Sequence, residues 1–226
     1  MRRLDVNIAF VIYAAIDRLM LEKLRKRLQA HHPQCLSVGM PRAAVLLPIV
    51  AREEPTLLLT RRAGHLAQHG GQVAFPGGKV EPEDADLWAT ALREAREEIQ
   101  LPPSRVEPLG RLSDVISRHG LCVTPFVGLI PPNLPLQPDG NELDAIFEVP
   151  LTWLLQDQRS HTDAIRHGER VYYVPSYAYQ DYVIWGLSAM MLVELLAVGF
   201  ARPISLDHAP PGRPVRHLAP RPTSLP

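Results

Sequence analysis

Three glutamates, Glu94, Glu97 and Glu98, are spaced three and four residues apart within one short segment. In a helix, residues at positions i, i+3 and i+4 share a face, so the three carboxylates would be neighbours. Hard divalent cations such as Mg²⁺ prefer carboxylate oxygens and are usually shared with substrate phosphates. Such a cation can polarise a phosphoryl oxygen and generate hydroxide. The alternative is a solvated acidic helix face that pairs with Arg93 and Arg96.

A glycine-rich turn precedes these glutamates in the segment 70–79, Gly-Gly-Gln-Val-Ala-Phe-Pro-Gly-Gly-Lys. Phe75 is expected to end a short strand, and Pro76 followed by Gly77 and Gly78 permits a tight turn with unusual backbone angles. Such a turn can direct backbone groups at a metal ion or a phosphate. Most Gly-Gly turns are merely turns, but the combination with three glutamates just downstream favours a metal site.

Basic side chains near the same segments are candidates for binding phosphate. Arg61, Arg62 and Lys79 flank the glycine-rich segment, and the planar guanidinium of arginine binds phosphate oxygens in bidentate fashion. The alternative for Arg61 and Arg62 is an alternating pair at a strand end, with one side chain merely exposed to solvent. His69 is a candidate substrate contact, and packing within its loop is an equally good interpretation.

The composition describes an ordinary soluble globular protein of 226 residues, with 46% hydrophobic residues and a formal net charge of zero. That length suffices for one sizeable domain plus extensions. Zero net charge gives no support to nucleic-acid or membrane-surface binding, which usually needs a basic excess. The two cysteines, Cys35 and Cys122, form no metal-binding spacing, so we expect a reducing, cytoplasmic setting.

The elements that must position these residues follow from the hydrophobic pattern. Strands are expected at 43–50, 56–60, 73–75, 106–112, 121–130, 145–149 and 171–174, and helices at 86–100 and 182–200. Asp84 or Asp86 can cap the first helix, and Pro102 and Pro103 stop it. Strands mixed with two well-separated helices predict an α/β fold in which a mixed sheet packs between helices.

We expect an extension at each end of a main domain that spans residues 41–202. Within residues 1–40, the spacing of Leu21, Leu24 and Leu28 predicts an amphipathic helix that packs on the domain or faces a partner. The apolar run before it is too short to span a bilayer and is favoured as helix over signal peptide. Residues 203–226 contain seven prolines in 24 residues and are expected to be a disordered tail.

The segment 78–101 resembles the signature of the Nudix hydrolase family, G-x5-E-x7-R-E-U-x-E-E-x-G-U, in which U is aliphatic. The corresponding residues are Gly78, Asp84, Arg93, Glu94, Ala95, Glu97, Glu98, Gln100 and Leu101. Asp84 replaces the first glutamate and is separated from Arg93 by eight residues rather than seven, while Ala95 and Gln100 occupy an aliphatic and a glycine position. The resemblance implies that the intact glutamates bind metal and that Arg93 braces the helix against the loop.

Segments outside this signature resemble the coenzyme A pyrophosphatase branch of the family. They are 57–63, 71–78, 123–128 and 184–189, with Ala67 at a position where the branch usually carries arginine. The resemblance covers most of residues 43–200 and implies a Nudix α/β/α sandwich around a mixed sheet. It implies cleavage of coenzyme A or its thioesters into 3′,5′-ADP and a 4′-phosphopantetheine, with Gln72 and His69 among the substrate-binding residues.

The resemblance also implies roles for the acidic residues. Glu94 and Glu98 would be the main ligands of Mg²⁺ or Mn²⁺, with Glu97 assisting and a carbonyl near Gly78 adding a ligand. A carboxylate can orient or deprotonate the attacking water, and Glu97 or Glu98 is the first candidate. Glu142 is a second candidate for the base or for an extra ligand, and a surface acid at a strand entrance is the alternative interpretation.

Three functions remain open from the sequence. The first is a coenzyme A diphosphatase, and the second is a Nudix enzyme for an ADP-sugar, a dinucleotide or a nucleoside triphosphate. The third is a non-catalytic Nudix module that senses a nucleotide or binds a partner, against which the intact glutamates argue. The expected partner is a small nucleotide, with neither nucleic acid nor membrane, and a homodimer is left open.

Overall fold

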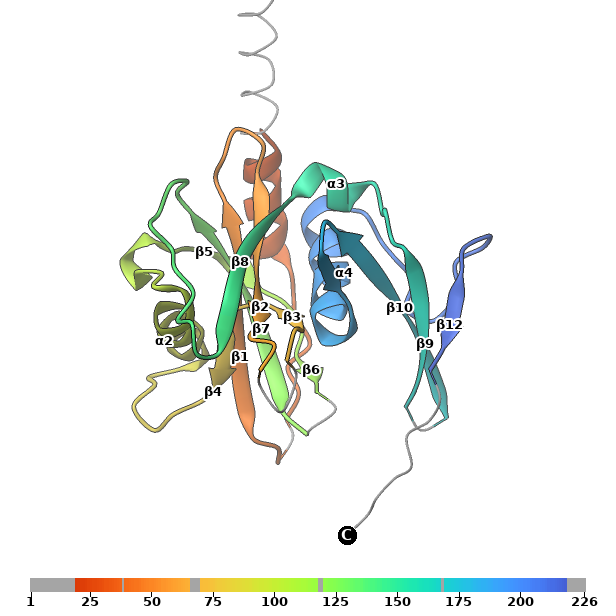
Figure 1. Ribbon diagram of the computed structural model, residues 1–226, viewed down its shortest axis with the longest axis horizontal. Helices are drawn as coiled ribbons and strands as arrows, with labels where there is room; N and C mark the ends of the chain where they lie inside the picture. The colour runs from red at the N-terminus through yellow and green to blue at the C-terminus, as the bar shows by residue number, and fades with distance from the viewer. Residues whose placement is uncertain (1–18, 38, 66–69, 118–119, 168, 219–226) are drawn as a thin grey trace, which may run out of the picture.

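The computed structural model describes residues 19–37, 39–65, 70–117, 120–167 and 169–218 (Figure 1). Its helices are α2 (Leu87–Ile99), α3 (Leu151–Leu155), α4 (Gly186–Phe200), the 3-10 turn η1 (Pro103–Arg105) and a helical segment over 19–30. Its strands are β1 (Arg42–Val50), β2 (Thr56–Arg62), β3 (Val73–Ala74), β4 (Gly77–Lys79), β5 (Glu107–Arg111), β6 (Val115–Ile116), β7 (Cys122–Ile130), β8 (Leu143–Pro150), β9 (His161–His167), β10 (Arg170–Tyr179), β11 (Tyr182–Ile184) and β12 (Val215–His217). Among these residues, no helix is long and apolar enough to cross a membrane.

The main sheet has the strand order β3-β2-β1-β7-β5, with β4 paired to β1, β6 to β7 and β8 to β2. Strands β1 and β7 run parallel and the other pairs run antiparallel, so the sheet is mixed, as expected. Strand β1 is buried along nearly its whole length because both faces of the sheet are covered. Leu47 and Ile49 enter one hydrophobic core, while Ala44 and Leu46 enter a second core on the opposite face.

Helices cover both faces of this sheet, so the fold is the expected α/β/α sandwich (Figure 1). On one face, α2 packs on β1 through Ala91, Ala95 and Ile99. On the other face lie α4 and the segment 19–30, whose Leu24 is fully buried. The N-terminal helix that the leucine spacing predicted therefore packs on the domain. Residues 1–18 lie outside the described part of the chain.

A second sheet, with the order β11-β10-β9-β12, lies on the far side of α4 (Figure 1). Three of its strands lie where we expected something else. The helix expected at 182–200 begins only at Gly186, and Tyr182–Ile184 pairs with β10 as β11. Trp185 has an extended backbone and Gly186 has a positive φ of 58°, so the helix does not extend back to Tyr182. Strand β9 was not expected because His161–His167 carries only two apolar residues.

The C-terminal segment differs in part from the disorder expected for 203–226. Strand β12 pairs parallel with β9, and Arg216 forms hydrogen bonds with the buried carboxylate of Asp163. The composition of this segment cannot supply much apolar burial. Backbone pairing with β9 and the Arg216–Asp163 ion pair order it instead. The expectation is therefore wrong for Val215–His217, and residues 219–226 lie outside the described part.

Candidate active site

Helix α2 begins and ends with polar contacts that fix its position. The Asp86 side chain accepts a hydrogen bond from the Ala89 N–H at 2.7 Å, so Asp86 rather than Asp84 is the N-cap. Gln100 ends the helix in the left-handed conformation with φ 58°, and its N–H bonds the last carbonyls. Gln100 thus adopts the backbone conformation for which the family signature places glycine.

Asp84 braces Arg93 despite the altered spacing between them. It accepts hydrogen bonds from the Arg93 Nε at 2.9 Å and Nη2 at 3.1 Å, and others from Thr90 and the Glu81 N–H. The hydrogen bonds from Arg93 hold the pKa of Asp84 far below its ordinary value. Arg93 also donates from Nη2 to the Lys79 carbonyl at 2.9 Å, which joins α2 to the end of β4.

Glu94 and Glu98 face the Gly77–Gly78 strand. Glu98 is only 9% exposed and accepts a hydrogen bond from the Gly77 N–H at 2.9 Å. Burial, opposed by that bond and reinforced by the charge of Glu94, raises the pKa of Glu98 to about 8. Burial also raises the pKa of Glu94, although Arg93 opposes this rise. The two carboxyl groups are thus close enough for the charge of Glu94 to disfavour ionisation of Glu98.

The two glycines of the turn are required by close approaches. Strand β4, which we did not expect, pairs with β1 so that Gly78 lies opposite Ala44. Gly77 has a φ of 153°, and a Cβ there would overlap the Ala44 carbonyl. A Cβ on Gly78 would overlap the carboxylate of Glu94. The glycine turn therefore brings backbone up against the acidic face of α2.

Glu97 is the most exposed of the three helical glutamates. Its side chain is 59% exposed and accepts a hydrogen bond from the Arg93 Nη1 at 3.1 Å. In the described part of the chain, no three His, Cys, Asp or Glu side chains form a group able to hold a metal ion. The Arg93 Nη1 also donates to Glu94 at 3.1 Å, so Arg93 links Glu94 to Glu97, while Glu98 is held by the Gly77 N–H.

Arg62 and Glu142 lie beside the carboxylate pair. They form an ion pair of 3.2 Å, and the charge of Arg62 lowers the pKa of Glu98 while that of Glu142 raises it. Glu142 arrives there because the preceding loop docks on the C-terminus of α2, where the Asp139 N–H donates to the Glu98 carbonyl at 3.0 Å. The main-chain contact explains how a glutamate so distant in sequence joins this site.

The remaining candidates lie near the same end of the sheet in different settings. The Gln72 carbonyl accepts a hydrogen bond from the Arg62 N–H at 2.9 Å, and the Lys79 side chain is exposed at the end of β4. Arg61 forms an ion pair of 2.7 Å with Asp144, and its guanidinium lies 5.5 Å from the ring centre of Tyr182. His69 lies outside the described residues. The sequence analysis missed Asp144 and Tyr182, since neither belongs to a local spacing pattern.

Comparison with known proteins identifies the family of this chain. The sequence model of the NUDIX domain family matches residues 40–168, more than half of the chain. The "Uncharacterized Nudix hydrolase NudL" of Salmonella paratyphi B is 48% identical over 182 residues, covering 79% of this chain and 94% of the relative. The protein of the same name from Salmonella heidelberg matches equally.

Two solved structures share parts of the fold. The C. elegans Ap4A hydrolase binary complex has a TM-score of 0.43 at 18% identity, covering 50% of this chain and 83% of its own. The NUDIX domain of Shewanella oneidensis NrtR, complexed with ADP ribose, has a TM-score of 0.42 at 21% identity, covering 57% and 80%. From the family match and the relatives at 48% identity, the chain belongs to the Nudix family and is a hydrolase of diphosphate bonds.

Proposed function

We propose that this enzyme hydrolyses the diphosphate of coenzyme A or its thioesters, with Mg²⁺ or Mn²⁺, to 3′,5′-ADP and a 4′-phosphopantetheine. The observation that carries the reaction is the Glu94–Glu98 pair, held against the Gly77–Gly78 backbone by a helix that Asp84 and Arg93 lock in place. The choice of coenzyme A rests on the resemblance of segments 57–63 and 71–78 to that branch of the family.

The carboxylate pair fits a hard divalent cation. Burial raises the pKa values of both adjacent carboxyl groups, and the charge of Glu94 adds to the rise at Glu98. A cation between them would reverse this repulsion, and Mg²⁺ typically takes one or two carboxylates and completes its shell with water and substrate phosphates. We assign Glu94 and Glu98 as the main ligands, with the Gly78 carbonyl as a further ligand and Glu97 in an assisting role. When bound, the cation would polarise a phosphoryl oxygen and acidify the attacking water.

The other residues of the site orient the reactants. Arg93 fixes the distance between α2 and β4, because it bonds both Asp84 and the Lys79 carbonyl. Glu97 and Glu142 have exposed carboxylates, so either is available to orient or deprotonate water. We assign Arg62, Lys79 and Gln72 to the substrate phosphates. Arg62 ends β2 beside the carboxylates, and its N–H bonds the Gln72 carbonyl. Lys79 directly follows Gly78. The role proposed for His69 rests on the sequence alone.

The test is hydrolysis of coenzyme A by the purified protein with Mg²⁺ or Mn²⁺, with products separated by chromatography. We expect 3′,5′-ADP to accumulate, and Glu98→Gln serves as the control for contaminating activity. If ADP-ribose is consumed and coenzyme A stays intact, the assignment to the coenzyme A pyrophosphatase branch is wrong, but the assignment to diphosphate hydrolysis is right. No hydrolysis of any nucleotide diphosphate would favour the non-catalytic module instead.

A further inference from the structure

Arg61 and Arg62 are neighbours in sequence but lie on opposite faces of the main sheet. Side chains alternate along β2, so Leu57 and Leu59 enter the core beneath α4 and Leu58 enters the core beneath α2. Arg62 continues the α2 side, where its charge acts on Glu98. Arg61 continues the α4 side, where the partly buried Tyr182 packs against the core. The two arginines therefore cannot serve the same phosphate in the same way.

A carboxylate and an aromatic ring hold the Arg61 guanidinium. Asp144 accepts a hydrogen bond from Nε at 2.7 Å, and the guanidinium carbon lies 5.5 Å from the centre of the Tyr182 ring. That ring is itself stacked on Phe147, with centroids 3.7 Å apart and planes inclined by 3°. Within the described residues, Asp144 is the only hydrogen-bond partner of the Arg61 side chain, which remains 36% exposed. The terminal nitrogens are thus left to meet a ligand.

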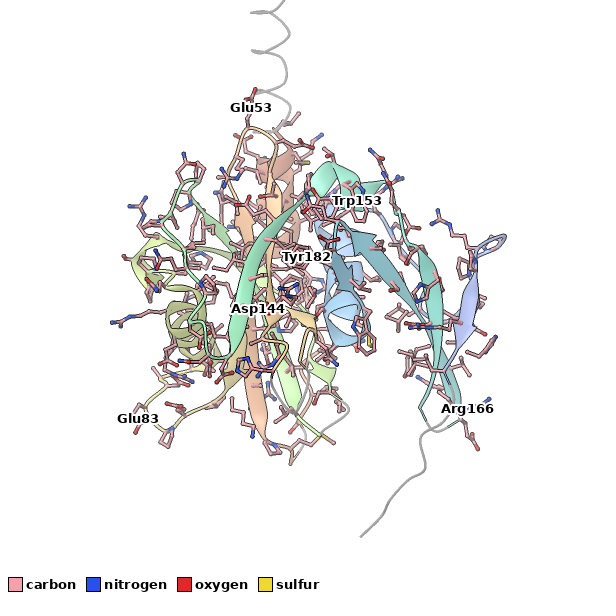
Figure 2. All side chains as sticks on the ribbon, viewed as in Figure 1. Glu53, Glu83, Asp144, Trp153, Arg166 and Tyr182 are labelled. Carbon is pink, nitrogen blue, oxygen red and sulfur yellow. The ribbon has the colours of Figure 1, made fainter. Side chains whose placement is uncertain are left out.

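The ring that orients Arg61 belongs to the second sheet. Tyr182 is the first residue of β11, and β11 contacts β3 at the edge of the main sheet. Figure 2 shows Asp144 on β8 and Tyr182 beside that strand, on the side toward α4. Strand β11 of the second sheet therefore lies near the end of β2, on the face of the main sheet opposite the carboxylate pair.

We propose that Arg61, oriented by Asp144 and Tyr182, forms a second anion subsite that binds a phosphate outside the diphosphate to be cleaved. A preoriented guanidinium whose terminal nitrogens have no partner among the described residues suits bidentate binding of a phosphomonoester. In coenzyme A that group is the 3′-phosphate, so the assignment rests on the proposed function. Tyr182 is then a positioning residue, which acts on the substrate through Arg61.

The kinetic test compares coenzyme A with 3′-dephospho-coenzyme A. We expect the wild-type enzyme to prefer coenzyme A, and Arg61→Ala to lower its kcat/KM about 10- to 100-fold through KM, as charge-assisted hydrogen bonds are lost. Tyr182→Leu should lower the same value about threefold to tenfold, since the cation–π contact is lost. Tyr182→Phe, which keeps the ring, is the matched control and should match wild type. All three variants should leave 3′-dephospho-coenzyme A nearly unaffected.

Two further measurements separate positioning from a general structural effect. Tyr182→Leu should have no added effect in an Arg61→Ala background if the tyrosine acts through the arginine. Calorimetry without metal should show that the wild type binds 3′,5′-ADP more tightly than AMP, and that Arg61→Ala abolishes this difference while thermal unfolding shows the variant folded. Equal effects of the variants on both substrates, or additive effects in the double variant, would overturn the inference.

Failure of this inference is distinguishable from failure of the proposed function. If the wild type hydrolyses coenzyme A and 3′-dephospho-coenzyme A equally well and Arg61→Ala changes neither, the second subsite is wrong and coenzyme A hydrolysis stands. If the wild type hydrolyses neither but consumes ADP-ribose, the proposed substrate is wrong, and with it the ligand assigned to Arg61.

Discussion

Replacing Glu98 with glutamine should stabilise the metal-free protein while it abolishes catalysis. The Glu98 carboxyl has a pKa of about 8 against an ordinary value of 4.5, chiefly because of burial. A raised folded-state pKa means that stability is highest below the unfolded-state pKa and falls as pH rises toward the folded-state pKa. At 1.36 kcal/mol per pKa unit, this shift lowers the free energy of unfolding by roughly 3 kcal/mol at pH 7, because the carboxyl is ionised in the unfolded chain and mostly protonated in the folded one.

Glutamine has nearly the same shape and still accepts the hydrogen bond from the Gly77 N–H, but it carries no charge. In EDTA, Glu98→Gln should therefore unfold at a temperature roughly 6–12 °C above wild type at pH 7, with a smaller gap at pH 5. Adding Mg²⁺ should raise the wild-type value and leave the variant unchanged, because the cation would bind only the carboxylate pair. Turnover should fall by orders of magnitude.

The measurement is a thermal unfolding series by circular dichroism at pH 5, 6, 7 and 8, with and without Mg²⁺, beside a coenzyme A assay. Glu97→Gln is the matched control, because the side chain of Glu97 is 59% exposed and the substitution should not stabilise the metal-free protein. A gap between Glu98→Gln and wild type that does not widen with pH would refute the account of Glu98. A fully active variant would refute its role as a metal ligand.

Two further substitutions test the frame around the carboxylates. Asp84→Asn should weaken both hydrogen bonds to Arg93 and lower unfolding free energy by about 1–3 kcal/mol, measured by urea titration, with a lower kcat. Unchanged stability and activity would show that Arg93 needs no brace. Gly78→Ala should displace the Glu94 carboxylate and weaken Mn²⁺ binding, measured by isothermal calorimetry, more than Gly39→Ala, where a Cβ meets nothing. Equal Mn²⁺ affinity in both variants would contradict the close approach of Gly78.

The sequence predicted the elements whose signals are local. Long apolar runs predicted β1 and β7, and the apolar stripe beside the acidic face predicted α2. Strand β11 was missed because Tyr182–Ile184 is as apolar as the helix that follows, and only the backbone angles at Trp185 and Gly186 divide them. Strand β9 was missed because pairing partners on both sides, rather than its own side chains, order it.

The same distinction between local signals and long-range contacts applies to the residues of the site. Spacing within one helix placed Glu94 beside Glu98, but it did not show that the Arg93 Nη1 bonds both Glu94 and Glu97. The sequence aligned Asp84 with the first acidic position of the signature, and the structure shows that Asp84 bonds Arg93 although one extra residue separates them. Strand alternation separates Arg61 from Arg62, and which face each takes depends on strand neighbours that the sequence does not reveal.

The short strand β12 has a consequence for any shortened form of this chain. It occupies the outer edge of β9, where Thr162 donates to the Pro214 carbonyl and Arg216 pairs with buried Asp163. A chain cut after residue 202 would leave that edge with unpaired backbone groups, which is a template for strand-to-strand self-association between molecules. Such a chain would also lack Arg216, the arginine that pairs with the buried Asp163 carboxylate. Strand β12 thus covers an edge that would otherwise promote aggregation, and a purification tag is better attached beyond this strand than in its place.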